Sequence, residues 1–464
     1  MNTYLRRTAR SSRFLPALAA ASLGVISCDE QAHALSPPTP APTSEPAITG
    51  NIPVVIPPHN TNLSPTDSRP FFDTFSWESF IALNWPAAQG QPGVPEQPNN
   101  PVILRNAANG SPVVWMSYKT SDDLFSTGTE RPKPWITGPT NSSAIQGTKA
   151  NLPVLARFTK SKSADEMTDT KQAFSFPLVD QNSAYVRYEV RYNQQFYDFV
   201  RGDDTVPSSW LYLSKNLAPK EPVTMPAANP SQNLPGALMV KASWREMTPA
   251  DVSSQRFYVI DAMVQNVDGT TYSPKKMGLV GLHIAQKLPN FPEWIWSTFE
   301  QVDNVQRGPG ATATTPISFN NGTNVPPTIG GWADRPESMK PTTHPKPVQV
   351  TRFNPIPNTP AGNSTMDVNL TYQQALKGTV WQYYELVITQ WPSDPKNFKT
   401  MESGGVYPTS AGGAFPATGC TNTTMETYFQ APNDAAGAGG NSCMSCHYQA
   451  GQADFSWGLM RRAH

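Results

Sequence analysis

Two cysteines and a histidine near the C-terminus have the spacing that attaches haem covalently to a polypeptide. The run Cys443-Met444-Ser445-Cys446-His447 is a Cys-x-x-Cys-His motif, the attachment signature of c-type haem. Cys443 and Cys446 would form thioethers to the two vinyl groups of the porphyrin, and His447 would supply the proximal nitrogen to the iron. The motif therefore predicts one covalent haem c, with His447 as a metal ligand.

Three other chemistries also use a Cys-x-x-Cys pair: a disulfide, a thioredoxin-like redox centre and a zinc knuckle. A thioredoxin-like motif lies near the start of a βα unit, which the C-terminal position does not offer. Structural zinc needs a second pair of Cys or His ligands with similar spacing, and the sequence has none. The other cysteines are Cys28 and Cys420, so a disulfide framework is not expected.

The second axial position of the iron has several candidate ligands. Three histidines fall outside the expected folded elements: His59, His344 and His464. His283 lies in "MGLVGLHIAQ", an expected buried strand, where an imidazole among Leu and Ile requires a polar partner. It is either a core histidine paired with backbone or a carboxylate, or a distal iron ligand or hydrogen-bond donor. Met425 and Met460 are the thioether alternatives.

Aromatic and basic side chains near the motif are candidates for contact with the haem. Trp457 follows His447 so closely in sequence that we predict it to bind the cofactor. Other large aromatics of this chain are more typical of core: Trp244, Trp294, Trp296, Trp381 and Trp391. Arg461 and Arg462 either pair with the haem propionates or form a solvated tail.

The walls of a haem pocket must come from upstream of the motif, because only residues 448–464 follow it. Segments rich in β-branched and aromatic residues predict strands at 112–118, 183–190, 236–244, 256–264, 277–285, 347–353 and 380–391. Short helices are expected at about 74–84, 193–200, 292–300 and 371–378. The predicted class is a β-dominated α+β fold, an antiparallel sheet or sandwich with short helices and a C-terminal haem-attachment segment.

The N-terminal sequence predicts export. Residues 1–34 combine a basic start with an apolar run too short to span a bilayer. Cys28 ends "VISC", which resembles a lipobox, whereas "AHA" at 32–34 resembles an ordinary cleavage site. We expect a protein of the periplasm or cell envelope, with a possible lipid anchor at Cys28.

Composition suggests how the rest of the chain is organised. Residues 35–69 are rich in Pro, Ser and Thr and are expected to form a tether, 70–442 a single β-rich body, and 443–464 the attachment segment. The chain has 35 basic and 35 acidic residues, so no net charge favours binding to nucleic acid.

The tail "CMSCHYQAGQADFSWGL" is similar to the end of cytochromes c′-beta and their hydroxylamine-oxidising relatives. In that group a β-rich body precedes a C-terminal Cys-x-x-Cys-His motif, which an Asp and an aromatic pair follow. The resemblance spans 443–459 and carries over the three motif residues, with Asp454 and Phe455 as the following patch. Enzymatic members also attach a lysine to the porphyrin. Lys241 is the candidate in a strand here, although a strand lysine usually points to solvent.

Longer segments resemble large, single-haem bacterial cytochrome c family proteins. They are "LVDQNSAYVRYEVRYN", "GLHIAQKLPNFPEWIWSTFEQVDN" and "NTTMETYFQ", together with the terminal "CMSCH". This resemblance implies one haem and no particular reaction.

The sequence favours an exported c-type cytochrome that transfers electrons to or from a redox partner protein. The alternative is a haem oxidoreductase or gas-binding sensor with an open distal site that receives a small molecule. A third class, a binding protein in which the haem is incidental, has the least support.

Overall fold

The computed structural model describes thirteen parts of the chain: 46–58, 65–125, 130–139, 152–155, 176–217, 222–305, 317–322, 342–352, 354–358, 364–391, 421–430, 443 and 447–463. The chain divides into two units, and all of these residues belong to the second, Pro40–His464. The predicted export signal and Cys28 lie outside the described residues. Within the described ranges, no helix is both long and apolar enough to cross a membrane.

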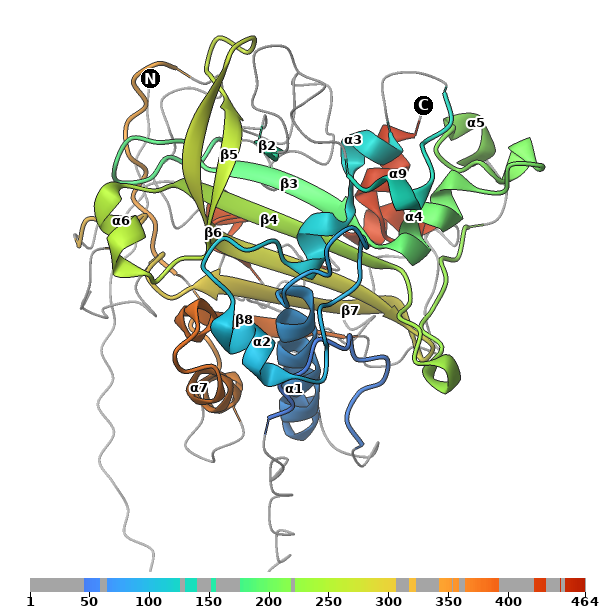
Figure 1. The fold of residues 1–464 in the computed structure, drawn as a ribbon, viewed down its shortest axis with the longest axis horizontal. Coiled ribbons are helices and arrows are strands. Elements are labelled where there is room, and N and C mark those ends of the chain that lie inside the picture. The colour runs from blue at the N-terminus through green and yellow to red at the C-terminus, as the bar shows by residue number, and fades with distance from the viewer. Residues whose placement is uncertain are drawn as a thin grey trace, which may run out of the picture. The chain divides into compact units, whose positions relative to one another are not determined.

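A single eight-stranded sheet forms the framework of the described part (Figure 1). Its strands are β1 (Lys119–Thr120), β2 (Val154–Leu155), β3 (Arg187–Tyr192), β4 (Leu238–Glu246), β5 (Val259–Gln265), β6 (Tyr272–Leu288), β7 (Phe291–Gln301) and β8 (Tyr384–Gln390). The order is β1-β3-β4-β6-β5-β2, and β7 pairs with both β6 and β8. Every pair is antiparallel except β2 with β5.

The helices of the described residues are short apart from the first. They are α1 (Pro65–Leu83), α2 (Pro101–Asn106), α3 (Ser121–Leu124), α4 (Gln194–Arg201), α5 (Ser214–Leu217), α6 (Pro249–Ser254), α7 (Thr365–Ala375) and α9 (Trp457–Arg462). Asn193 caps α4 by accepting a hydrogen bond from the Phe196 backbone, and Gly202 follows the helix with φ +74°. The fold is a β-dominated α+β fold built on a sheet, as the sequence predicts.

Strand β6 joins the two halves of the sheet because its edges have different neighbours. One edge pairs with β4, from Met277 to Gln286. The other edge pairs first with β5 and then, from Gly281 onward, with β7. His283 is therefore flanked by Lys241 of β4 and Thr298 of β7.

Side chains in this part of the sheet alternate between two faces. Lys241, His283 and Thr298 form one row across three strands, and Trp296 lies two residues from Thr298 on the same side. We call the side defined by these four residues the C-terminal face. Ser297 lies between Trp296 and Thr298 and so points to the opposite side, which we call the helix face.

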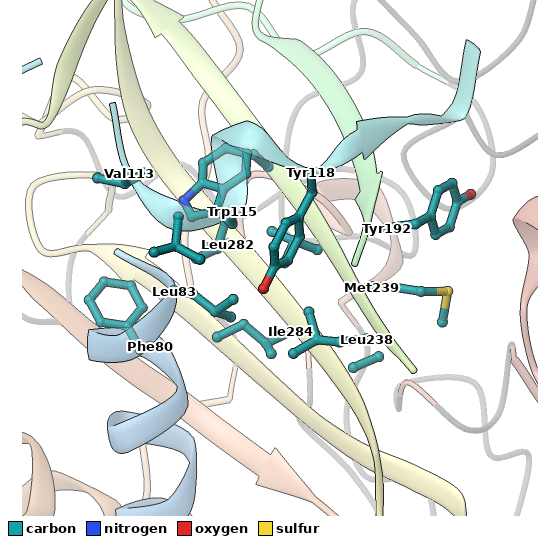
Figure 2. Close-up of a cluster of buried hydrophobic side chains, with 14 of the residues drawn as sticks. Phe80, Leu83, Val113, Trp115, Tyr118, Tyr192, Leu238, Met239, Leu282 and Ile284 are labelled. Carbon is teal, nitrogen blue, oxygen red and sulfur yellow. The ribbon is translucent and has the colours of Figure 1, made fainter. Parts of the chain in front are cut away.

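Helix α1 packs on the helix face. The hydroxyl of Ser76 lies 2.7 Å from that of Ser297 and 2.7 Å from that of Thr389. Figure 2 shows part of the apolar cluster on this face, in which Phe80 and Leu83 of α1 lie together with Leu282 and Ile284 of β6. Burial of a large apolar side chain contributes about 1.5–3 kcal/mol, so this layer is a main source of stability.

Residues 421–430 pack on the C-terminal face through polar groups. Asn422 donates from Nδ2 to Thr298 Oγ1 at 3.0 Å, and the Thr424 hydroxyl lies 2.6 Å from that of Ser243. Gly281 is required beneath this segment, because a Cβ there would collide with the Thr424 hydroxyl. These contacts connect a segment late in the chain to the centre of the sheet.

Residues 46–58, inside the predicted tether, contact the body where they are described. Gln286 Nε2 donates to the Pro53 carbonyl at 2.6 Å, and Val54 is buried. Helix α1 begins at Pro65, five residues before the predicted start of the body. The division into tether, body and attachment segment stays a prediction.

Four local predictions differ from the structure. In the predicted strand 380–391, Val380–Tyr383 form a 3-10 helix that precedes β8. Residues 292–300, predicted as a helix from Pro292, belong to β7, because their β-branched and aromatic side chains pair between β6 and β8. Within the predicted strand 112–118, Val114–Ser117 form a 3-10 helix. Residues 347–352, the described part of the predicted strand 347–353, belong to none of the eight strands.

Candidate functional site

A backbone carbonyl holds the His447 imidazole. Its Nδ1 lies 2.8 Å from the carbonyl oxygen of Phe455. A carbonyl oxygen can only accept, so Nδ1 must carry the hydrogen. In the neutral imidazole the other nitrogen, Nε2, then carries the lone pair, the form in which a histidine nitrogen binds a metal. Metal-ligating histidines generally donate their second ring nitrogen to such a partner, which fixes both tautomer and ring orientation.

An unusual turn places the Phe455 carbonyl in that position. Asp454 and Phe455 both have positive φ, +48° and +64°. Backbone hydrogen bonds from Asp454 N to Gly451 O and from Phe455 N to Ala450 O close the turn. Non-glycine residues in this region cost about 1–3 kcal/mol each, so the surrounding contacts must hold them there.

A buried ion pair holds the turn against the sheet. Lys287 Nζ of β6 lies 2.7 Å and 2.8 Å from the two carboxylate oxygens of Asp454. Asp454 Oδ2 also accepts from the Met225 backbone N–H at 2.8 Å. Burial raises the pKa of Asp454 and lowers that of Lys287, and each partner opposes the shift of the other. These contacts connect the sheet to Asp454, and the turn at Asp454 and Phe455 connects Asp454 to His447.

Trp296 of β7 packs against the imidazole. The ring centroids of Trp296 and His447 are 4.2 Å apart with planes at 45°. The indole Nε1 donates to the Glu293 carbonyl at 2.7 Å, which fixes the ring. His447 therefore lies on the C-terminal face of the sheet, in contact with a rigid aromatic side chain.

Trp296 is the contact that sequence reasoning missed. The sequence is typical of a core tryptophan at this position and predicts a helix for its segment. No feature of the sequence therefore predicts that its ring contacts the motif. Trp457, the predicted contact, is the first residue of α9 and is partly buried. Its role toward a cofactor stays a prediction.

Of the two motif cysteines, the structure describes Cys443. It is partly buried and packs against the main hydrophobic cluster, which also contains Phe455 and Leu459. Cys446 lies outside the described residues. Among the residues that are described, no group of three or more His, Cys, Asp or Glu side chains could hold a metal ion. A haem would instead need one such ligand, together with the thioethers.

His283 lies on the same face as Trp296 and has a carboxylate partner. Its Nε2 is 3.0 Å and 3.1 Å from the two carboxylate oxygens of Glu426, and its side chain is 17% exposed. Lys241 Nζ lies 3.8 Å from the same carboxylate. His283, Glu426 and Lys241 form what we call the Glu426 cluster. This matches the carboxylate-paired alternative, while a role as iron ligand stays a prediction.

The remaining candidates are dispersed. Met425 is fully buried in a second hydrophobic cluster, and Met460 is an exposed residue of α9. His344 is exposed beside the Thr343 hydroxyl. Arg462 pairs with Asp122 of α3 at 2.7 Å. Three candidates lie outside the described residues: His59, His464 and Cys420. For Arg461 the structure describes the backbone and not the side chain.

Comparison with known proteins identified no relative of this chain. No family model, no curated protein and no solved structure matches this chain.

Proposed function

We propose that this protein is an exported c-type cytochrome that carries one covalent haem on Cys443, Cys446 and His447 and transfers electrons. The observation that carries the proposal is the bond from His447 Nδ1 to the Phe455 carbonyl, because it presents Nε2 as a metal-binding lone pair. The histidine that makes this bond is the one that ends the Cys-x-x-Cys-His motif, so the bond and the motif both support the proposal.

The attached haem would supply one-electron redox chemistry at its iron. The protein's own contribution is to fix the orientation of the ligand. Trp296 contacts the His447 ring on the C-terminal face. The Lys287–Asp454 pair holds the turn whose carbonyl orients that ring. A ligand held in one orientation needs little rearrangement when the oxidation state changes, which suits electron transfer with a redox partner protein.

A haem enzyme or gas-binding sensor with an open distal site is the second candidate function. The observation that favours it is the bond between His283 Nε2 and Glu426, because a carboxylate engages that ring nitrogen. The partly exposed Glu426 cluster would then provide proton donors and acceptors beside a small-molecule substrate.

Absorption spectroscopy separates the two candidates. Electron transfer predicts a low-spin, six-coordinate spectrum that CO leaves unchanged, whereas an open distal site predicts a high-spin ferrous form that binds CO. The companion variant is His283→Ala. If its spin state and reduction potential both equal those of the wild type, His283 has no distal role.

We also propose that the protein is located in the periplasm or cell envelope and that Cys28 is its lipid-attachment residue. The basic start, the short apolar run and "VISC" support this proposal. Export suits the cofactor, because covalent attachment retains haem on a protein that has left the cytoplasm.

A further inference from the structure

Glu293 of β7 has a buried carboxyl group. The residue is 1% exposed, and neither side-chain oxygen has a partner among the residues that the structure describes. An ionised carboxylate in such a place is costly, because no group of the described residues donates a hydrogen bond to it. The group is therefore favoured in its neutral, protonated form.

The nearest cation does not neutralise Glu293. Lys287 attracts its carboxylate, but an ammonium group has only three hydrogens to donate. Lys287 Nζ already lies within 2.8 Å of both Asp454 oxygens and of the Pro292 carbonyl oxygen. The charges of Lys287 and Asp454 cancel, so a proton on Glu293 leaves the buried group neutral, whereas its loss leaves one net negative charge.

A bulge in β7 places Glu293 beside the His447 contact. Gln286 pairs with Ile295 and Leu288 with Phe291, so 292–294 lie opposite Lys287 alone. The Glu293 carbonyl accepts the indole N–H of Trp296, whose ring contacts His447. The charged or titratable groups around Glu293 are thus Lys287 from β6, Asp454 from the C-terminal segment and, next to Trp296, His447.

We propose that Glu293 is a proton-exchange site whose occupancy is linked to the oxidation state of the haem, an inference that rests on the proposed function. When one electron enters from the redox partner, one proton from solvent forms an O–H bond on the Glu293 carboxylate. When the electron leaves, that bond breaks and the proton returns to solvent. The added proton offsets the positive charge that the iron loses, so buried charge changes little.

The pH range follows from the environment of the carboxyl. Burial raises the pKa of Glu293 to about 7, against the smaller opposing effect of Lys287. Extra positive charge on an oxidised iron favours the carboxylate, and reduction favours the acid. The reduction potential should therefore fall as pH rises through about 7.

The first experiment measures the reduction potential of the haem-loaded protein against pH in the wild type, Glu293→Gln and Glu78→Gln. Glu78 is the matched control, because burial also raises its pKa to about 7 but it lies on α1, which packs on the helix face. We expect Glu293→Gln to flatten the curve near pH 7 and Glu78→Gln to retain it. A Glu293→Gln curve equal to that of the wild type would overturn the proposal.

The second experiment follows the proton directly by infrared difference spectroscopy. Reduction of the wild type should produce a carboxylic-acid C=O band that shifts on ¹³C-glutamate labelling and is lost in Glu293→Gln. Absence of that band from the wild type overturns the proposal even if the variant fails to fold. If no haem is attached, the proposed function fails and the linkage fails with it. A pH-difference spectrum of the unloaded protein then tests the remaining claim, that Glu293 exchanges a proton near pH 7.

Discussion

His447 and Phe455 are joined by one hydrogen bond, from the imidazole Nδ1 to the main-chain carbonyl oxygen eight residues later, at 2.8 Å. The bond sets the tautomer of the only motif ligand and depends on two residues with positive φ.

Replacement of Lys287 by Met should destabilise the protein. It leaves Asp454 buried without its cation, which costs about 3–5 kcal/mol for a broken buried pair. Urea denaturation measures the change. The matched control is Lys276→Met, because Lys276 pairs with Asp261 on the surface, and that change should cost no more than about 1 kcal/mol.

The double variant Lys287→Met, Asp454→Leu removes both charges of the same ion pair. Removal of both charges removes the uncompensated carboxylate, so we expect the double variant to be more stable than Lys287→Met alone. A double variant less stable than the single one would show that Asp454 acts chiefly through Met225 or the turn rather than through Lys287.

Trp296→Ala should affect both stability and the environment of His447. Loss of a buried tryptophan costs about 3–5 kcal/mol, and the His447 ring loses its aromatic contact. The control is Trp391→Ala, which removes a buried ring stacked on Phe72 in another cluster. We expect similar denaturation midpoints for the two variants but a changed haem absorption spectrum only for Trp296→Ala. A haem absorption spectrum of Trp296→Ala equal to that of the wild type would contradict the position of Trp296 beside the haem ligand.

Glu78 should make stability depend on pH. Burial raises its pKa in the folded protein from 4.5 to about 7, so between these values the unfolded chain has lost a proton that the folded chain keeps. The free energy of unfolding therefore falls as pH rises through this range and levels off above it.

Glu78→Gln removes that dependence. Urea denaturation measures the free energy of unfolding of the variant minus that of the wild type. This difference should be about 1–3 kcal/mol larger at about pH 8 than at about pH 5. Glu130→Gln, at an exposed residue, is the control and should shift by less than about 0.5 kcal/mol at either pH. A Glu78→Gln difference that is the same at both pH values would show that the carboxyl is not protonated in the folded protein.

Cys28→Ser should abolish lipid attachment. The wild type, expressed in a bacterial host, should incorporate labelled fatty acid and remain with the membrane fraction, while the variant should do neither. Cys420→Ser is the matched control and should behave as the wild type. An unlabelled wild-type protein whose mature N-terminus is Leu35 would instead support cleavage after "AHA".

The sequence was informative about chemistry and fold class because both have local signals. The motif spacing identifies Cys443, Cys446 and His447 without reference to the fold. The strand at 277–285 was found from its β-branched, apolar composition, and the structure extends it to Tyr272–Leu288.

The partners of the site could not be predicted from the sequence, because they depend on pairing between distant segments. Pro292 predicts the start of a helix, but the pairing of β7 with β6 and β8 outweighs that local signal. Trp296, Lys287 and Glu426 meet their partners on the C-terminal face only through this register and the positions of residues 421–430 and 447–463. No spacing along the chain relates any of them to His447.

Haem attachment is the most direct test of the account. The full chain should be expressed with a cytochrome c maturation system, denatured, and examined by the pyridine haemochrome spectrum and by intact mass, with Cys443→Ala, Cys446→Ala as the control. The account predicts a c-type haemochrome and the added mass of one haem in the wild type, both lost in the control. A wild-type protein that carries no covalent haem under these conditions would contradict the central claim.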